Sequence, residues 1–252
     1  MVVYTEAKPK DKEETRKQVL FGDNMNFTQT EVARMMDFSA VHAECDLNDI
    51  RFMVEKAKQY KPFAIFALPA WTSVLIDMLG DTSDTKIGGV VGFPSGGDTT
   101  ASKVIQAKEL IAMGCTELDM VINIGKLRSG LSEEVAQDIR AVVGAAGSRP
   151  VKVIFECGHL SDEQIRCACE LSVRAGVGYV KTGTGWADCT RIQEYVSLMH
   201  SCVGDSVGIK AAGGIRDLEM LIDLYQRGAR RFGVGISSAV AILEQCGPDG
   251  GG

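Results

Sequence analysis

Two lysines in this chain each end a short apolar run and are followed at once by glycines. Residues 178–185 read GYVKTGTG, and residues 208–216 read GIKAAGGIR. Each pattern predicts a buried strand that delivers an amine to the rim of a pocket. Burial of one ammonium close to another disfavours the charged form of both, so at least one of Lys181 and Lys210 should lose its proton easily enough to act as a nucleophile. The pair indicates Schiff-base chemistry, and two solvated lysines at strand ends are the alternative.

Two further predicted strands carry charged residues that an enclosed interior would bring near these amines. Along 117–122 the period of two places Glu117 and Asp119 on one face, so an inward acidic face would turn Asp119 toward the lysines. Lys152 shares a strand face with Glu156 in the same way. Lys152 either pairs with Glu156 along that face or supplies a third amine whose charge disfavours protonation of its neighbours, and both interpretations stay open.

Glycine clusters follow the last two predicted strands. The backbone amides of such loops, together with a helix N-terminus, often bind phosphate, although tight turns also require glycine. We therefore expect a small phosphorylated ligand, with hydroxyls and amides beside the first lysine contributing to the same anion site. The candidate substrate- and phosphate-binding residues are Asp37, Thr182, Thr184, Gly185, Gly213, Gly214, Arg216, Gly235, Ser237 and Ser238.

Apolar strand-like runs alternate with helical patterns along almost the whole chain, and this alternation would position the charged residues. Between the strands lie helical patterns such as 161–175, opened by a capping box of Ser161 and Gln164, and 218–227, capped by Asp217. Strand–helix repeats with continuous apolar strands predict a parallel sheet that is buried on both faces. The expected fold is an α/β (β/α)8 TIM barrel, whose active site lies at the carboxyl ends of the strands. Its eight predicted strands are 31–37, 62–68, 86–91, 117–122, 151–156, 178–181, 207–210 and 231–234.

A length of 252 residues suits one such barrel. We expect a single catalytic domain at 31–245, preceded by an N-terminal helical extension at 1–30 that does not fit the repeat. The closing segment 246–252 is rich in glycine, which predicts a flexible tail.

The composition argues against several classes of function. The net charge is −6 and no stretch clusters lysine and arginine beside aromatic residues, so we expect no nucleic-acid partner. No window approaches the roughly 18 apolar residues of a membrane span, and the first residues lack the apolar segment of a signal peptide, which predicts a cytoplasmic protein without membrane contact. The eight cysteines show no paired zinc-binding spacing, so we expect reduced, mostly buried thiols, no metal and no cofactor.

Taken together, these segments resemble the deoxyribose-phosphate aldolase family. The resemblance runs from about residue 92 to residue 243 and includes GFP at 92–94, ELDMVINIG at 117–125, VKVIFE at 151–156, VKTGTG at 180–185 and KAAGGIR at 210–216. It implies that Lys181 forms the Schiff base, while Lys210 and Asp119 activate it and move protons. The further residues that the resemblance assigns are Lys152, near this group, and Gly213, Gly214 and Ser237 at the substrate phosphate.

The first third of the chain departs from that family pattern. The first predicted strand ends in DFS at 37–39, where the family usually has Asp, then His or Leu, then Thr; the second ends in FALP at 66–69, where the family commonly has a cysteine and an asparagine before the proline. The implied reaction is cleavage of 2-deoxy-D-ribose 5-phosphate to acetaldehyde and D-glyceraldehyde 3-phosphate, and its reverse. The departures leave two alternatives: a Schiff-base aldolase for another phosphorylated sugar, or a non-catalytic barrel that binds a sugar phosphate. Assembly into a homo-oligomer through the outer helices also stays open.

Overall fold

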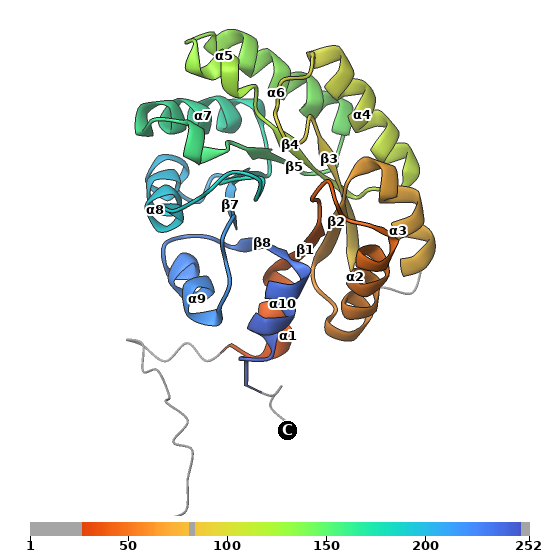
Figure 1. Cartoon of the computed structure of the whole chain (residues 1–252). Helices are drawn as coiled ribbons and strands as arrows, with labels where there is room; N and C mark the ends of the chain where they lie inside the picture. The colour runs from red at the N-terminus through yellow and green to blue at the C-terminus, as the bar shows by residue number, and fades with distance from the viewer. Residues whose placement is uncertain (1–26, 81–83, 248–252) are drawn as a thin grey trace, which may run out of the picture.

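The chain forms a closed barrel of eight parallel strands, which confirms the predicted TIM barrel (Figure 1). The computed structural model describes residues 27–80 and 84–247. Each strand pairs with its neighbours in sequence, and the last strand closes the barrel against the first, with Asp37 opposite Gly233. The strands are β1 (Met36–Ala40), β2 (Ala64–Ala67), β3 (Lys86–Val91), β4 (Glu117–Val121), β5 (Val151–Ile154), β6 (Tyr179–Lys181), β7 (Gly208–Ala212) and β8 (Arg231–Gly235).

Helices surround the barrel and cover the outer face of the sheet (Figure 1). Within the described residues, α1 precedes the first strand, α10 follows the last one, and these two helices contact each other. The helices are α1 (Gln29–Met35), α2 (Leu47–Tyr60), α3 (Thr72–Leu79), α4 (Thr100–Met113), α5 (Ile124–Arg128), α6 (Ser132–Ala146), α7 (Asp162–Ala175), α8 (Ile192–Val203), α9 (Leu218–Gln226) and α10 (Ile236–Leu243), with short 3₁₀ turns η1 (Pro69–Trp71) and η2 (Cys157–His159).

The prediction of a strand at 31–37 is wrong, because a capped helix occupies most of that segment. The Thr28 hydroxyl accepts a hydrogen bond from the Glu31 amide, and the Glu31 side chain accepts one from the Thr28 amide. This capping box satisfies two donors that a helix start would otherwise leave unpaired. The helix therefore continues to Met35, and the strand begins only at Met36.

Both predicted chain ends lie largely outside the described residues. This holds for 1–26 of the extension predicted at 1–30, and for 248–252 of the tail predicted at 246–252. The described parts of the two ends meet, because Thr28 and Gly247 form an isolated parallel bridge.

Two helix starts follow their sequence patterns. The Ser161 hydroxyl accepts from the Gln164 amide and the Gln164 side chain accepts from the Ser161 amide, so the predicted capping box opens α7. Asp217 caps α9 as predicted, by accepting a hydrogen bond from the amide of Met220. In the part of the chain that the structure describes, no helix combines the length and the apolar character that crossing a membrane requires.

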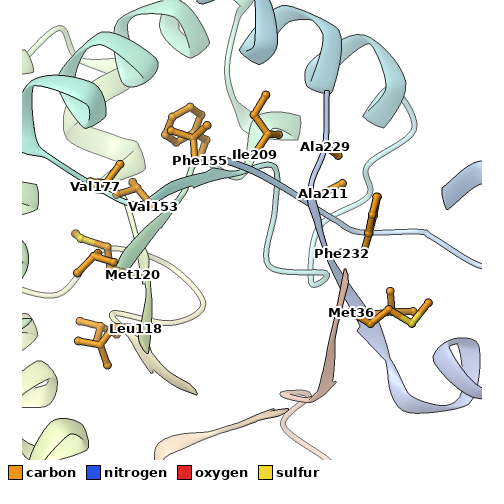
Figure 2. Close-up of a cluster of buried hydrophobic side chains, with 14 of the residues drawn as sticks. Met36, Leu118, Met120, Val153, Phe155, Val177, Ile209, Ala211, Ala229 and Phe232 are labelled. Carbon is orange, nitrogen blue, oxygen red and sulfur yellow. The ribbon is translucent and has the colours of Figure 1, made fainter. Parts of the chain in front are cut away.

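The barrel strands separate apolar from charged side chains by their period of two. In β4, Leu118 and Met120 point outward into the core between sheet and helices, whereas Glu117 and Asp119 point into the barrel, as predicted. Figure 2 shows part of this core, with Leu118, Met120, Val153, Phe155, Ile209, Ala211 and Phe232 among the labelled side chains. Because this packed layer fixes the register of the strands, charged side chains from different strands meet inside the barrel.

The cysteines are spread over the fold. All eight are free thiols, as predicted. Only Cys115, Cys157 and Cys169 are buried, however, and Cys202 is exposed. The expectation that most of the thiols are buried is therefore wrong.

Candidate active site

The interior of the barrel holds a compact cluster of seven charged side chains from six strands. None of them is more than 7% exposed. Charges removed from water destabilise a fold unless they are paired, and each of these has an oppositely charged partner close by. This lumen cluster consists of Asp37, Glu117, Asp119, Lys152, Lys181, Lys210 and Arg231.

Asp119 stands at the centre of the lumen cluster. Its Oδ1 accepts a hydrogen bond from Lys152 at 2.9 Å, and its Oδ2 accepts from Lys181 at 2.8 Å and from Lys210 at 2.7 Å. Burial alone would raise the pKa of this carboxyl, but the three ammonium groups outweigh burial and hold the pKa well below its usual range. Asp119 is therefore a carboxylate that joins three strands.

Lys181 holds its proton less tightly in the lumen cluster than an ordinary lysine does. Burial, together with the charges of Lys210 and Lys152, lowers its pKa to about 8, although Asp119 acts in the opposite direction. The charge balance acts in the same direction as burial, because the lumen cluster contains three carboxylates and four basic groups, so one basic group lacks a negative counterpart. Loss of the proton from Lys181 balances the cluster and leaves a neutral amine.

Lys152 remains a cation. Its Nζ lies 2.7 Å from Glu117 Oε1 and 2.9 Å from Asp119 Oδ1. Burial would lower its pKa, but the carboxylates of Asp119, Asp37 and Glu117 raise the pKa above the ordinary lysine value. Lys152 therefore acts as the third amine of the sequence hypotheses, since its fixed charge contributes to the low pKa of Lys181.

The interpretation that Lys152 pairs with Glu156 is wrong. β5 ends at Ile154, and Glu156 takes a left-handed backbone conformation with a φ of 54°. Its carboxylate faces the loop after β6 and accepts hydrogen bonds from the amide and the hydroxyl of Thr184. Glu156 thus fixes that loop, whereas the charged partners of Lys152 lie on other strands.

Asp37, which we expected at the substrate, is engaged with cations of the lumen cluster. Its Oδ2 lies 2.5 Å from Lys210 Nζ, and its Oδ1 accepts a hydrogen bond from Arg231 at 2.7 Å. Burial opposes ionisation, but Lys210, Lys152 and Arg231 keep the pKa of Asp37 below its usual value. Arg231 was not among the predicted site residues. The only feature of the sequence that could have indicated it is its position as a charged residue at the start of an apolar strand.

A cavity of about 210 Å³ lies over the lumen cluster, at the carboxyl ends of the strands. Lys181 and Lys210 both line it. On the β1–β3 side its lining combines the polar residues Asp37, Ser39 and His42 with four apolar ones, Val41, Phe66, Val90 and Phe93, and these four are called the apolar wall below. On the β7–β8 side, the lining residues include Gly213, Gly214, Arg216, Gly235 and Ser238.

The β7–β8 side has the backbone geometry of an anion site. Gly213 and Gly214 both have positive φ, at 107° and 77°, a conformation that glycine adopts without strain. Gly235 is the N-cap of α10 and offers no side-chain cap, so the first amides of the helix stay available to a ligand. The predicted phosphate-binding glycines therefore come together in the fold.

Two of the predicted binding residues do not line the cavity, whereas Thr184 and Gly185 do. The buried Thr182 hydroxyl donates to the Ala212 carbonyl at 2.7 Å and accepts from the Ala212 amide at 2.9 Å, so it joins β6 to β7. Ser237 is exposed beside the lining residue Ser238. Across residues 27–80 and 84–247, no group of three or more His, Cys, Asp or Glu side chains is arranged to hold a metal ion.

An exposed tryptophan, also absent from the predicted site, lies at the mouth of the barrel. Trp186, on the loop after β6, donates its indole N–H to the Val41 carbonyl at 3.0 Å. Its ring lies near those of His42 and Phe93, with centroids 6.0 and 6.2 Å away. The loop after β6 thus reaches the loop after β1.

Comparison with known proteins identifies the family. The model of the DeoC/LacD family aldolases matches residues 26–243 of this chain. The chain belongs to the DeoC/LacD family of aldolases. Membership confirms the resemblance seen in the sequence and makes the protein a lyase. The match includes β1 and β2, so the departures found there are variations within the aldolase family.

Similar aldolases cover most of the chain. The deoxyribose-phosphate aldolase of Klebsiella pneumoniae subsp. pneumoniae is 44% identical over 226 residues, which span 88% of this chain and 91% of that protein. The deoxyribose-phosphate aldolase of Sinorhizobium medicae is 42% identical, over 86% of this chain and 87% of that protein. The tetrameric structure of deoxyribose phosphate aldolase from Aeropyrum pernix is similar with a TM-score of 0.76 and 29% identity, covering 86% of this chain and 91% of that chain.

Proposed function

We propose that this aldolase cleaves 2-deoxy-D-ribose 5-phosphate to acetaldehyde and D-glyceraldehyde 3-phosphate, and catalyses the reverse addition, through a Schiff base on Lys181. The observation that carries the proposal is the state of Lys181, whose amine lines the cavity, has a pKa of about 8 and donates to Asp119 at 2.8 Å. An amine that loses its proton near neutral pH can attack a carbonyl. The substrate is supported by the relatives, which are deoxyribose-phosphate aldolases.

The reaction begins when the neutral amine of Lys181 adds to the C1 carbonyl of the open-chain sugar. Loss of water gives a protonated imine, which acts as the electron sink. The C3 hydroxyl then loses its proton and the C2–C3 bond breaks, so that D-glyceraldehyde 3-phosphate leaves and an enamine remains on Lys181. Protonation of the enamine at C2, followed by addition of water, releases acetaldehyde and restores the amine.

Asp119 and Lys210 move protons in these steps. One oxygen of Asp119 accepts hydrogen bonds from both Lys181 and Lys210, so it links the nucleophile to a second amine. Lys210 also lowers the pKa of Lys181 through its charge. Lys152 binds the other oxygen of Asp119 and holds that carboxylate in place.

The substrate phosphate binds on the β7–β8 side of the cavity. Consecutive backbone amides at Gly213 and Gly214 and the uncapped start of α10 suit an anion, and Arg216 adds a positive charge at the rim. The apolar wall offers few partners to a hydroxyl group, which favours a sugar with a methylene at C2.

The test is aldehyde release from a panel of phosphorylated sugars, with Lys181→Met as the matched control. We expect 2-deoxy-D-ribose 5-phosphate to be cleaved fastest, and the control to release nothing because it has no amine at this position. Faster cleavage of another phosphorylated sugar would reject the substrate but keep the Schiff-base mechanism. Absence of aldehyde from every sugar would reject the whole proposal.

Three further features belong to the same proposal. The catalytic domain spans 31–245, with 1–30 as an extension and 246–252 as a tail, and the enzyme acts in the cytoplasm, where its eight free thiols stay reduced. Copies of the chain associate through the outer helices, as the tetrameric relative from Aeropyrum pernix suggests. Light scattering of the eluting protein during size-exclusion chromatography measures this association, and a monomer mass would reject it.

A further inference from the structure

β2 places an aromatic ring among the ammonium groups of the lumen cluster. Phe66 is 2% exposed and lines the cavity together with Lys181 and Lys210. The centroid of its ring lies 4.2 Å from Lys210 Nζ and 4.9 Å from Lys152 Nζ. Both distances allow cation–π attraction, which is stronger where water is excluded.

The neighbouring strand leaves room for this ring. In the strand register, Gly88 of β3 lies directly beside Phe66 of β2. A Cβ atom at Gly88 would be 2.1 Å from ring atoms Cε1 and Cζ of Phe66, so any side chain there would displace the ring. Gly88 therefore allows the ring to keep its place against the ammonium groups.

The ring completes the surroundings of Lys210. The Lys210 ammonium lies 2.5 Å from Asp37 Oδ2 and 2.7 Å from Asp119 Oδ2. Lys210 donates a hydrogen bond to Asp119 and forms an ion pair with Asp37, and because an ammonium has three N–H groups, one remains for the ring face of Phe66. An aliphatic side chain of similar size would fill the space but would attract the cation far less.

We propose that Phe66 is a positioning residue of the aldolase reaction, whose ring face holds the ammonium of Lys210 beside Lys181. The inference rests on the proposed function, because it concerns the amine that shares Asp119 with the Schiff-base lysine. Phe66 acts through Lys210. A change that weakens the ring electrons but keeps the shape of the apolar wall should therefore slow turnover and leave the affinity for the phosphorylated substrate unchanged.

The test replaces Phe66 of the full-length chain with phenylalanine that carries one, two or three ring fluorines. Fluorine withdraws electron density from the ring face, which weakens cation–π attraction while the shape changes little. We expect kcat for 2-deoxy-D-ribose 5-phosphate to fall with each fluorine, by about tenfold in total, with KM unchanged. The matched control is the same series at Phe38, which is fully buried in the apolar core and should keep the wild-type kcat.

The outcomes separate this inference from the function on which it rests. Equal kcat values across the Phe66 series would overturn the positioning role, because packing alone does not depend on ring electrons. A rising KM with constant kcat would overturn it as well, since the ring would then act on the substrate and not on Lys210. A wild-type protein that cleaves no sugar would instead reject the proposed function, and this inference with it.

Discussion

Replacement of Lys210 by methionine tests how the lumen cluster controls the nucleophile. Methionine keeps an unbranched stem between Asp37 and Asp119 but removes the charge. Lys181 and Lys210 donate to the same oxygen of Asp119 at 2.8 and 2.7 Å, so their nitrogen atoms are at most about 5.5 Å apart. The substitution therefore deletes a positive charge close to the nucleophilic amine.

The size of the effect follows from that separation. Two like charges about 5.5 Å apart repel by about 3 kcal/mol at an effective dielectric constant of about 20, which corresponds to about two pKa units. Without Lys210, three carboxylates face three basic groups, so Lys181 binds its proton more tightly, and its pKa should rise from about 8 to about 10. The neutral fraction of Lys181 at pH 7 then falls from about one tenth to about one thousandth, and the rate at that pH falls about 100-fold.

The assay is the pH dependence of kcat/KM for 2-deoxy-D-ribose 5-phosphate. The acid limb of the profile should move up by about two pH units. If kcat/KM of the variant stays below that of the wild type at pH values above the new pKa, the remaining difference reports the loss of proton transfer by Lys210. Lys103→Met is the matched control, because Lys103 is also fully buried and paired, with Asp138 at 2.6 Å, but lies outside the lumen cluster. An acid limb that stays in place in Lys210→Met would refute the reasoning.

Three further predictions concern the nucleophile and the two sides of the cavity. Lys181→Arg should show no acetaldehyde release in a single-turnover assay while circular dichroism shows an intact fold, because a guanidinium stays protonated; measurable release would contradict the assignment. In Gly214→Val the new side chain has open space, but the φ of 77° imposes backbone strain of about 1–2 kcal/mol. KM should therefore rise more for the phosphorylated substrate than for free 2-deoxyribose. Equal rises for both substrates would mean that Gly214 serves only the turn and does not bind phosphate. Ribose 5-phosphate should have a kcat/KM about 100-fold below that of the 2-deoxy sugar, because a hydroxyl that faces the apolar wall finds few hydrogen-bond partners there; similar values would contradict that role of the wall.

Most of the barrel could be predicted from sequence because its strands are short apolar runs, most of which are closed by a glycine or a charged residue. The strand predicted at 86–91 has the observed bounds of β3, and the other predicted strands after the first overlap their observed counterparts. The prediction of the first strand was wrong because the apolar residues at 32, 33, 35 and 36 fit a strand as well as a helix. The deciding signal was the Thr28–Glu31 capping box, which lies just before that run.

The site was predictable where one strand alone decides the direction of a side chain. The period of two placed Asp119 inside the barrel, and the strand ends placed Lys181 and Lys210 at one rim. Pairings between strands could not be predicted in this way, because Asp37 with Arg231 depends on how β1 and β8 close the barrel. The contacts of Phe66 with Lys152 and Lys210 could not be predicted either, because nothing in the sequence shows that an apolar residue in a strand will face cations.

Lys152 and Glu156 show where the period of two stops applying. Both residues would share one face if β5 continued to residue 156, which is why their pairing was a reasonable hypothesis. The strand ends at Ile154, and the left-handed backbone at Glu156 turns its carboxylate to Thr184. A left-handed glutamate is uncommon, so no residue preference in the sequence indicates it.

The central claim is that the amine of Lys181 becomes covalently bound to the substrate carbonyl, and reductive trapping tests it most directly. The protein is incubated with acetaldehyde, reduced with borohydride and digested, and mass spectrometry locates the added two-carbon group. We predict that the group is on Lys181, the lysine whose pKa of about 8 makes its neutral form accessible. Its appearance on Lys210 or Lys152, with Lys181 unmodified, would contradict the account.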